Sequence, residues 1–417
     1  MRKVFIAGGA HTKFIGKFHP DFIWKKHPDF GKRDNPNLEW YIQEPAINAL
    51  SESKIVAAAV DKAFVGNFVG ELFAKQGHLG AVLAAADPDL AGKPISRVEG
   101  ACASGGLALA AGIDAIRAGS NVVLVVGGEV QTTENAKVGA DYLARAAHYR
   151  TQREIDPFTF PCIFARRTKA IVEQTDTTMG DCARASVKAY NNANKNHFAH
   201  MHTVKMTLEQ ANTFSDQNPF FLTNPEFKEY LRVSDCSQVS DGGSAVVLCS
   251  EQGLEKTGRH PSDCIEVVGF QVATASLSAQ AKQTELETTS IAAHRAYAEA
   301  RVTAKEIQLA EVHDCFTVTE ILMYEALGFA EKGKGAYLLR EGATEIDGKI
   351  PVNPGGGLVG FGHPVGATGV KQAFEIYRPL KKQCGDYQSK SGPKIGLSAN
   401  MGGDDRTAVV GIYRNVS

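Results

Sequence analysis

The sequence predicts an α/β fold in which apolar strands alternate with helices, and three observations support this class. Short β-branched runs such as residues 4–8, 122–126 and 395–398 alternate with stretches of helical length and pattern. The order of strands and helices in the first part of the chain recurs in the last part, which indicates an internally duplicated α/β unit. Three turns that follow strand-like runs carry cysteine or histidine, as expected where an open α/β sheet gathers its reactive groups.

The elements of the first part follow from local patterns. Residues 4–8 are apolar and β-branched and predict the first strand, whereas residues 45–53 predict a helix. Residues 60–68 return to a strand. Residues 102–118 predict a helix of small residues, and residues 122–126 predict a fully buried strand that ends in Gly-Gly-Glu.

The last part repeats this succession. Strands are expected at residues 265–269, 309–312, 395–398 and 407–413, and helices at residues 288–300, 317–327 and 365–380. Before this part, residues 245–248 mark the return to a buried strand. The chain between the two parts is richer in aromatic, His, Asn and charged residues and contains Asp-Pro-Phe and Asn-Pro-Phe turns. Such an insertion is expected to lie over the edge of the sheet and to form part of a binding cleft.

These patterns divide the chain into three regions. Residues 1–130 form an N-terminal half, which residues from about 231 to 262 complete. Residues 131–230 form an inserted covering domain, and residues 263–417 form the C-terminal half.

Composition excludes several classes of function. With 417 residues and a formal net charge of −1, the chain is not expected to bind nucleic acid or an anionic membrane as its main partner. No apolar run reaches the roughly 18 residues of a membrane span. The N-terminus is expected to form a strand rather than a signal peptide, and the last residues do not spell a peroxisomal signal. A cytoplasmic location is the default expectation, with a mitochondrial or other organelle matrix as the alternative.

Eight cysteines are scattered along the chain, without metal-site spacing and without the density of a disulfide scaffold. We therefore expect reduced thiols. A cluster formed by His197, His200 and His202 lacks a carboxylate or cysteine at the usual spacing, and no metal site is expected. Cysteines expected to be structural are Cys162, Cys182, Cys236, Cys249, Cys264 and Cys384.

Cys102 lies in the Glu-Gly-Ala-Cys-Ala-Ser-Gly-Gly turn of residues 99–106, just before the predicted small-residue helix. The positive end of a helix dipole and its unpaired N–H groups would lower the pKa of the Cys102 thiol. The same N–H groups could hold a developing oxyanion. The alternative is a buried, inert cysteine in a helix of small residues.

His363 lies in the glycine-rich turn of residues 362–369, Gly-His-Pro-Val-Gly-Ala-Thr-Gly. Glycines on both sides allow the backbone to approach a ligand closely. Together with Cys102, this imidazole is a candidate base that takes the proton of the thiol. A structural histidine is the alternative.

His313 and Cys315 are two residues apart in the His-Asp-Cys-Phe sequence that leaves a predicted strand. In an extended segment both side chains point to the same side of the backbone. They could then act as a general acid/base and an oxyanion donor, and a thiol of near-neutral pKa could carry a proton in both directions. The alternative is a core cysteine and a capping histidine, and Asp314 is expected to be structural.

These motifs resemble the thiolase superfamily, and specifically thiolases of the sterol-carrier-protein type. That type carries His-Asp-Cys-Phe where other thiolases carry Asn-Glu-Ala-Phe. Residues 240–242, 320–328 and 353–358 also resemble the family, and the likeness spans nearly the whole chain. The resemblance implies a thiolase fold, in which two similar βαβαβ-type halves pack as an α/β/α/β/α layered core with an inserted loop domain.

The resemblance also implies roles for the four side chains. Cys102 would be the nucleophile that becomes acylated, and His363 would activate it. His313 and His363 would form an oxyanion hole for the thioester oxygen of the second acyl-CoA. The backbone N–H groups of Cys102 and Gly402 would form a second oxyanion hole for the acyl-enzyme.

Most thiolases supply a further acid/base thiol from a Cys-x-Gly turn, which here reads Asn-Met-Gly-Gly at residues 400–403. The sterol-carrier type shows the same loss and uses the thiol of its His-Asp-Cys-Phe turn, which is Cys315 here. Two other segments depart from the family. Residues 404–406, Asp-Asp-Arg, are expected to alter the last hairpin beside the pocket, and residues 273–282 replace a Met-Gly-x-Gly-Pro segment on the CoA side. Residues that bind CoA are left unassigned.

The resemblance therefore implies an acyl-CoA C-acyltransferase of lipid or fatty acid metabolism. It would cleave a 3-ketoacyl-CoA such as acetoacetyl-CoA with CoA, or run the reverse Claisen condensation, with acyl-CoA and CoA as partners and no cofactor. A homodimer or dimer of dimers is expected, formed through the strand at residues 122–126.

Two alternatives stay open. A decarboxylating ketoacyl synthase also uses Cys with two His residues, but it forms its enolate without removing a C–H proton, so Cys315 favours the thiolase. A non-catalytic CoA- or lipid-binding protein of the same fold is the other alternative. The presence of all four reactive side chains argues against it.

Overall fold

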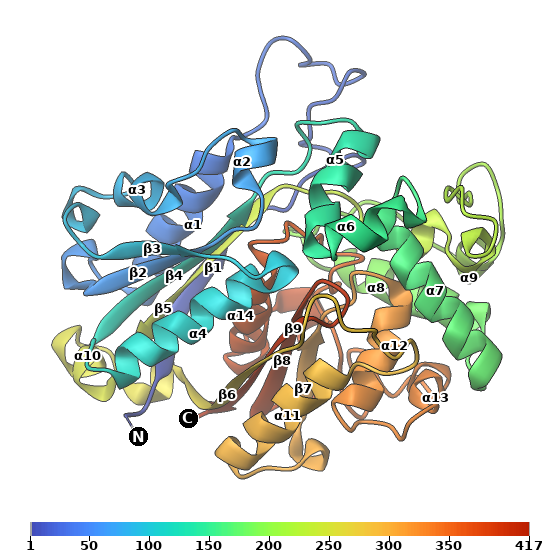
Figure 1. Cartoon of the computed structure of the whole chain (residues 1–417). Coiled ribbons are helices and arrows are strands. Elements are labelled where there is room, and N and C mark those ends of the chain that lie inside the picture. The colour runs from blue at the N-terminus through green and yellow to red at the C-terminus, as the bar shows by residue number, and fades with distance from the viewer. Residues whose placement is uncertain (1, 417) are drawn as a thin grey trace.

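The computed structural model describes residues 2–416, and a nine-stranded mixed sheet forms its centre (Figure 1). The strand order is β3-β2-β4-β5-β1-β6-β9-β8-β7. The strands are β1 (Phe5–His11), β2 (Lys62–Gly66), β3 (Ile95–Val98), β4 (Val122–Glu129), β5 (Gly242–Cys249), β6 (Ile265–Thr274), β7 (Leu309–Val312), β8 (Ile395–Gly402) and β9 (Thr407–Asn415).

Helices lie on both faces of this sheet and between its two halves. They are α1 (Leu38–Ser53), α2 (Gly70–Phe73), α3 (Leu79–Ala84), α4 (Ser104–Arg117), α5 (Ala136–Leu143), α6 (Tyr149–Gln152), α7 (Thr159–Gln174), α8 (Met179–Ala193), α9 (Leu208–Asn212), α10 (Glu251–Lys256), α11 (Glu287–Ala300), α12 (Thr317–Ala326), α13 (Gly335–Arg340) and α14 (Thr368–Leu380). Among residues 2–416, no helix combines the length and the apolar character that crossing a bilayer requires.

The sheet consists of two halves joined by a short seam. β1 pairs with β5 from Phe5 to His11, but with β6 only through Phe5 and Ile6. α4 and α14 contact each other and strands of both halves, whereas α1 covers the outer face of one half and α11 covers β6 and β9 of the other. This arrangement confirms the predicted thiolase fold with its α/β/α/β/α layers.

Three helices begin at other residues than the local patterns predict. α1 begins at Leu38 rather than at residue 45, because the Asn37 side chain caps it by accepting the Trp40 N–H at 2.9 Å. α4 begins at Ser104, so Cys102 lies in the 3₁₀ turn that precedes the helix rather than in the helix. α14 begins at Thr368, three residues later than predicted.

The strand predicted to form a dimer interface lies in the interior of the sheet. β4 pairs with β2 on one side and with β5 on the other, and all of its residues are buried. A strand with both edges paired cannot add a strand of a second chain. Residues 122–126 therefore cannot pair with a second chain, and the predicted dimer interface is wrong. That the protein is a dimer stays a prediction.

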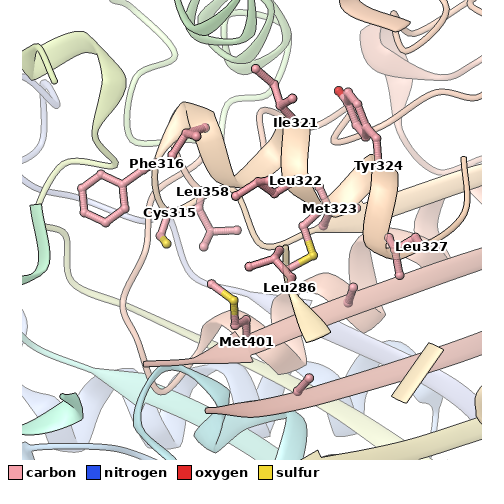
Figure 2. Packing of buried hydrophobic residues seen from close by; sticks show 14 of the residues in the cluster. Leu286, Cys315, Phe316, Ile321, Leu322, Met323, Tyr324, Leu327, Leu358 and Met401 are labelled. Carbon is pink, nitrogen blue, oxygen red and sulfur yellow. The ribbon is translucent and has the colours of Figure 1, made fainter. Parts of the chain in front are cut away.

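The inserted segment shares one hydrophobic core with the C-terminal half. The α7 residue Phe164 stacks on Phe316 with ring centroids 4.5 Å apart. Figure 2 shows Cys315 in this core beside Phe316, just before the first turn of α12, and Met323 of that helix lies near Leu286. The hydrophobic core is therefore continuous between the predicted covering domain and the C-terminal half. The division of the chain into three regions stays a prediction.

Residues 404–406, which depart from the family pattern, bond the last hairpin to α7 and α11. Asp404 accepts a 2.5 Å hydrogen bond from the fully buried Arg167 of α7. The same guanidinium donates to the backbone carbonyls of Lys282, Gln283 and Glu285. Asp405 accepts the N–H groups of the first turn of α11 at 2.8 and 3.0 Å. These contacts link the last hairpin to the insertion and to the first turn of α11 in the C-terminal half.

Replacing Asp404 by alanine should destabilise the protein strongly, because the buried Arg167 guanidinium would lose its ionic partner. Removing one member of a buried ion pair costs about 3–5 kcal/mol. Urea unfolding checks this expectation, with Asp347→Ala as the control. Asp347 pairs with Lys390, whose side chain is 88% exposed, and its loss should leave the unfolding free energy nearly unchanged because exposed ion pairs contribute little. Equal effects of the two substitutions would contradict the assigned role of Asp404.

Candidate active site

The predicted site residues lie around one cavity of about 470 Å³. Cys102, His313, Cys315 and His363 all line it. The remaining wall is mainly apolar. Its apolar residues include Phe68, Phe73, Leu143, Phe158, Phe160, Phe164, Phe221, Phe316 and Val365.

Three of the four side chains meet closely. The sulfur of Cys102 and one ring nitrogen each of His313 and His363 all lie within 4.8 Å of one another. The two imidazole rings are 5.0 Å apart between centroids and nearly perpendicular, at 89°. Cys102 also lies near enough to Cys315 to affect the pKa of the Cys315 thiol. The structure thus brings together residues from three distant turns of the chain.

Glycines allow these turns to approach backbone to backbone. A Cβ atom added to Gly369 would lie 2.1 Å from the Gly106 nitrogen, and one added to Gly127 would lie 2.4 Å from the Gly366 oxygen. A side chain at Gly369 would push the His363 turn away from the start of α4, and one at Gly127 would push the same turn away from the end of β4. The short separation of Cys102 and His363 therefore depends on glycine at both sites.

The pKa of Cys102 moves in the direction opposite to the prediction. Burial raises the pKa of this thiol to about 12, although the backbone N–H groups of Gly403 and of Cys102 itself oppose the shift. The thiol is therefore neutral in the free protein. A helix dipole would lower this pKa, but α4 begins only at Ser104, and the apolar wall removes the water that would solvate a thiolate.

His363 is neutral and has a defined tautomer. Burial lowers the pKa of His363 to about 3, with a smaller effect from the positive charge of Lys371. The Thr368 hydroxyl donates to the Pro364 carbonyl, so it accepts a hydrogen bond from Nδ1 of His363 at 2.7 Å. The proton of the neutral ring then lies on Nδ1, and Nε2 is free to accept a proton.

His313 has the opposite tautomer because of Asn400. The Asn400 amide oxygen accepts the Gly106 N–H at 3.2 Å, so its NH₂ group faces the Cys102 carbonyl and Nδ1 of His313, at 3.0 and 3.2 Å. Nδ1 must accept this hydrogen bond, which leaves the ring proton on Nε2. Burial, and then the neighbouring His363, lower the pKa of His313 well below its usual value.

Cys315 is held in place by the segment that precedes β5. Its carbonyl accepts the Ser237 N–H at 2.9 Å, and its sulfur lies 4.0 Å from the Thr319 hydroxyl. Burial, and then the nearby Cys102, raise the pKa of Cys315 well above its usual value. The expectation of a near-neutral pKa is wrong for the free protein. Asp314 is structural, as expected, and accepts the Leu358 N–H at 2.6 Å.

One backbone assignment shifts by a residue. Gly403, rather than Gly402, lines the cavity and directs its N–H to the sulfur of Cys102. Gly402 is the last residue of β8 and pairs with Thr407. The sequence motif located the turn, but the end of the strand decides which N–H faces the cavity.

Sequence reasoning missed the residues that orient the two imidazoles. Asn400 fixes His313, Thr368 fixes the ring of His363, and the Ser240 hydroxyl accepts the His363 N–H at 2.8 Å. All three lie inside motifs that the sequence already singled out. Their roles follow from hydrogen bonds between segments far apart in the chain, which a single sequence does not display.

The predicted structural cysteine Cys236 also lines the cavity. Its thiol donates a 3.4 Å hydrogen bond to the Arg232 carbonyl. Burial, then the negative charge of Asp235 and then the nearby Cys315, raise the pKa of Cys236 well above its usual value. Cys236 therefore offers an internal comparison for any role assigned to Cys315.

The histidine cluster differs from the predicted one. His19 lies against His202 and His200, with ring centroids 5.0 and 6.5 Å apart, whereas His197 packs against Phe198. His200 donates from Nε2 to the Lys17 carbonyl at 2.8 Å. This cluster therefore holds the segment after β1. Among residues 2–416, the group of side chains close enough to share a metal ion is Cys102 with His313 and His363.

Buried neutral histidines should make the protein sensitive to acid. Burial lowers the pKa of His11 and of His200 to about 4. The unfolded chain binds these protons near pH 6.5, so their contribution to stability is complete above about pH 6.5 and is lost as the pH falls toward 4. Each group should change the unfolding free energy by about 1.4 kcal/mol per pH unit in this window.

Urea unfolding at about pH 7 and about pH 5 checks this expectation. His200→Gln keeps a hydrogen-bond donor but removes the titrating group, and it should flatten the dependence on pH. His294→Gln changes an exposed histidine and should leave the dependence as in the wild type. The same pH slope in His200→Gln and in the wild type would contradict the expectation.

Comparisons with known proteins identify the family of the chain. Residues 41–252 match the family described as "Thiolase, N-terminal domain", and residues 269–415 match "Thiolase C-terminal domain-like". The chain is 36% identical to an acetyl-CoA acetyltransferase of Methanothermobacter thermautotrophicus, over 99% of this chain and 100% of the relative. It is 29% identical to sterol carrier protein 2 of Rattus norvegicus, over 99% of this chain and 72% of the relative.

Solved structures share the fold. The Ltp2-ChsH2(DUF35) aldolase superposes with a TM-score of 0.76 at 19% identity, over 100% of this chain and 98% of that chain. Human mitochondrial 3-ketoacyl-CoA thiolase in complex with CoA superposes with a TM-score of 0.68 at 18% identity, over 100% and 98% of the two chains. The family matches extend over both halves of the sheet, and this chain belongs to the thiolase family.

Proposed function

We propose that this protein is a thiolase-type acyl-CoA C-acyltransferase. It would cleave a 3-ketoacyl-CoA such as acetoacetyl-CoA with CoA, or run the reverse condensation, through an acyl group carried by Cys102. The observation that carries the proposal is the placement of two thiols and two neutral imidazoles on one apolar cavity. Relatives that are 31% and 36% identical and named acetyl-CoA acetyltransferase support the same class.

In the cleavage direction, the first step uses Cys102 and His363. The Cys102 proton moves to the free Nε2 of His363, and the resulting thiolate attacks the 3-keto carbon. The bond between C2 and C3 then breaks, and its electron pair forms the enolate of acetyl-CoA. Nε2–H of His313, and Nε2–H of His363 once it has taken the proton, face the enolate oxygen as hydrogen-bond donors.

The second half of the reaction restores both thiols. Cys315 gives its proton to C2 of the enolate, and acetyl-CoA leaves. CoA enters and loses its thiol proton to the Cys315 thiolate, and its sulfur attacks the acyl group on Cys102. The Cys102 thiolate is then released and takes its proton back from His363. Atoms and protons balance without a cofactor.

These pKa values keep both thiols and His363 neutral in the free protein, so proton transfer from Cys102 to His363 would accompany attack on the bound substrate. A thiol that stays neutral in the free protein does not expose a reactive thiolate to water, and each thiolate forms only when a bound substrate or intermediate can use it. The two donors for the enolate oxygen carry their Nε2 protons at different stages. Asn400 holds the proton of His313 on Nε2 before the reaction begins. His363 becomes a donor only after it has acted as the base.

Cys315→Ala should abolish exchange of the C2 hydrogens of acetyl-CoA with deuterium from solvent. Loss of a general base typically lowers a rate about 100- to 10,000-fold. NMR of acetyl-CoA in deuterium oxide measures the exchange, and intact-mass analysis should still detect acetylated Cys102. Cys236→Ala is the matched control, because it removes another thiol of the same cavity and should exchange at the wild-type rate. Exchange by Cys315→Ala as fast as by the wild type would remove Cys315 from the mechanism.

This experiment also separates the alternatives. A decarboxylating ketoacyl synthase would acylate Cys102 and release carbon dioxide from a malonyl thioester, without exchange at C2 of acetyl-CoA. A non-catalytic binder would bind CoA but show neither exchange nor cleavage of short or long 3-ketoacyl-CoA. The presence of Cys315 on the cavity favours the thiolase over both.

Asn400→Asp should lower kcat about 100- to 1000-fold, because it disturbs one oxyanion donor. A carboxylate can still accept the Gly106 N–H, but it cannot donate to Nδ1 of His313. The His313 proton would then favour Nδ1, and Nε2 would lose its donor. Steady-state kinetics measures the loss, with circular dichroism as a check of folding. A well-folded Asn400→Asp protein with wild-type kcat would show that the tautomer of His313 is unimportant.

A further inference from the structure

The segment between β1 and α1, residues 12–37, differs in charge from the rest of the chain. It extends beyond the sheet near α5 in Figure 1. It carries six basic and three acidic residues, in a chain whose formal net charge is −1. The basic residues are Lys13, Lys17, Lys25, Lys26, Lys32 and Arg33. A positive loop on a nearly neutral protein indicates an anionic partner.

Two of these basic residues are neutralised within the loop. Lys13 pairs with Asp21 at 2.7 Å, and Arg33 pairs with Asp29 at 2.9 Å. The other four, Lys17, Lys25, Lys26 and Lys32, are exposed, and none of them forms a salt bridge with the described residues 2–416. Their charges are therefore available to an anion from outside the chain.

Exposed aromatic rings accompany these lysines. Phe18 is 55% exposed and Trp24 is 39% exposed. The Lys17 amine lies 5.1 Å from the Phe18 ring centroid, and the Lys26 amine lies 5.8 Å from the Trp24 ring centroid. Aromatic faces beside amines suit a ligand that carries both a flat base and phosphate groups.

The loop reaches the cavity that holds the candidate catalytic residues. Lys17 and Phe22 line this cavity together with Cys102. Val239, on the same wall, is 48% exposed, whereas His313 is 1% exposed. The cavity therefore runs from a closed end at the imidazoles to an open end beside the loop. A long thioester with its carbonyl at the closed end would extend toward the loop.

The base of the loop is fixed although its tip is exposed. Ile15 and Asp241 exchange backbone hydrogen bonds of 3.0 and 2.8 Å, and His200 holds the Lys17 carbonyl. The Asn35 side chain binds both the N–H and the carbonyl of Ile23, at 2.8 and 2.9 Å. A fixed base reduces the entropy lost when a ligand binds to the tip.

We propose that this loop binds the nucleotide end of CoA. Lys17, Lys25 and Lys26 would pair with its diphosphate and 3′-phosphate, and the exposed ring of Trp24 would stack on the adenine. The inference rests on the proposed function, since it places the thioester of the same CoA molecule at Cys102. The loop would thus provide contacts to CoA in a chain where residues 273–282 replace the family's Met-Gly-x-Gly-Pro segment.

The test compares substrates with and without the nucleotide. Lys25→Glu combined with Lys26→Glu should lower kcat/KM for acetoacetyl-CoA about tenfold, since reversing two surface charges near phosphates replaces attraction with repulsion. The loss should be smaller with the dephospho-CoA thioester, absent with acetoacetyl-pantetheine, and smaller in about 0.5 M salt because ions screen exposed charges. Lys256→Glu is the matched control. It changes an exposed lysine at the end of α10, far from the loop in Figure 1, and should behave as the wild type.

Direct binding distinguishes failure of this inference from failure of the proposed function. Titration calorimetry with CoA and with pantetheine needs no turnover. The wild type should bind CoA more tightly, and the double variant should lose this preference, even if the protein proves inactive. Trp24 fluorescence should respond to CoA but not to pantetheine, and Trp24→Leu should abolish the response. Unchanged CoA affinity in the double variant would overturn the inference and leave the loop as a surface for an acidic protein.

Discussion

Burial of the reactive groups is the constraint on which the rest of the site depends. In the apolar cavity, charged forms of Cys102, His313, Cys315 and His363 lose the hydration that would stabilise them, so all four are neutral in the free protein. Neutral imidazoles carry one proton each, and its position matters. Asn400 and Thr368 place these protons on different nitrogens, which gives two otherwise similar histidines different abilities.

Close packing between the halves of the sheet brings the reactive turns together. α4 and α14 form the layer between the halves, and glycines at the ends of these helices let backbone meet backbone. Asn400 belongs to β8 of the C-terminal half, yet it binds the Cys102 carbonyl and the Gly106 N–H of the N-terminal half. A shift of one half against the other would therefore disturb the nucleophile and an imidazole together.

The acidic residues of the last hairpin, which depart from the family pattern, have a physical explanation in this chain. Asp404 and Asp405 do not disrupt the last hairpin, because a buried guanidinium and a helix N-terminus receive their carboxylates. The hairpin in turn presents the Gly403 N–H to the cavity. The basic loop after β1 is likewise anchored at its base, while its tip is left with exposed amines and rings.

The sequence by itself determined the alternation of strands and helices, the thiolase resemblance and the four side chains that line the cavity. Local patterns suffice for these, because strand periodicity and motifs such as residues 362–369 are written in consecutive residues. The roles of these side chains and the three-region division stay predictions. Only the tertiary structure decided the pKa directions, the tautomers, the interior position of β4 and the choice of Gly403 over Gly402. Each of these depends on burial or hydrogen bonds between residues far apart in the chain, which no local pattern records.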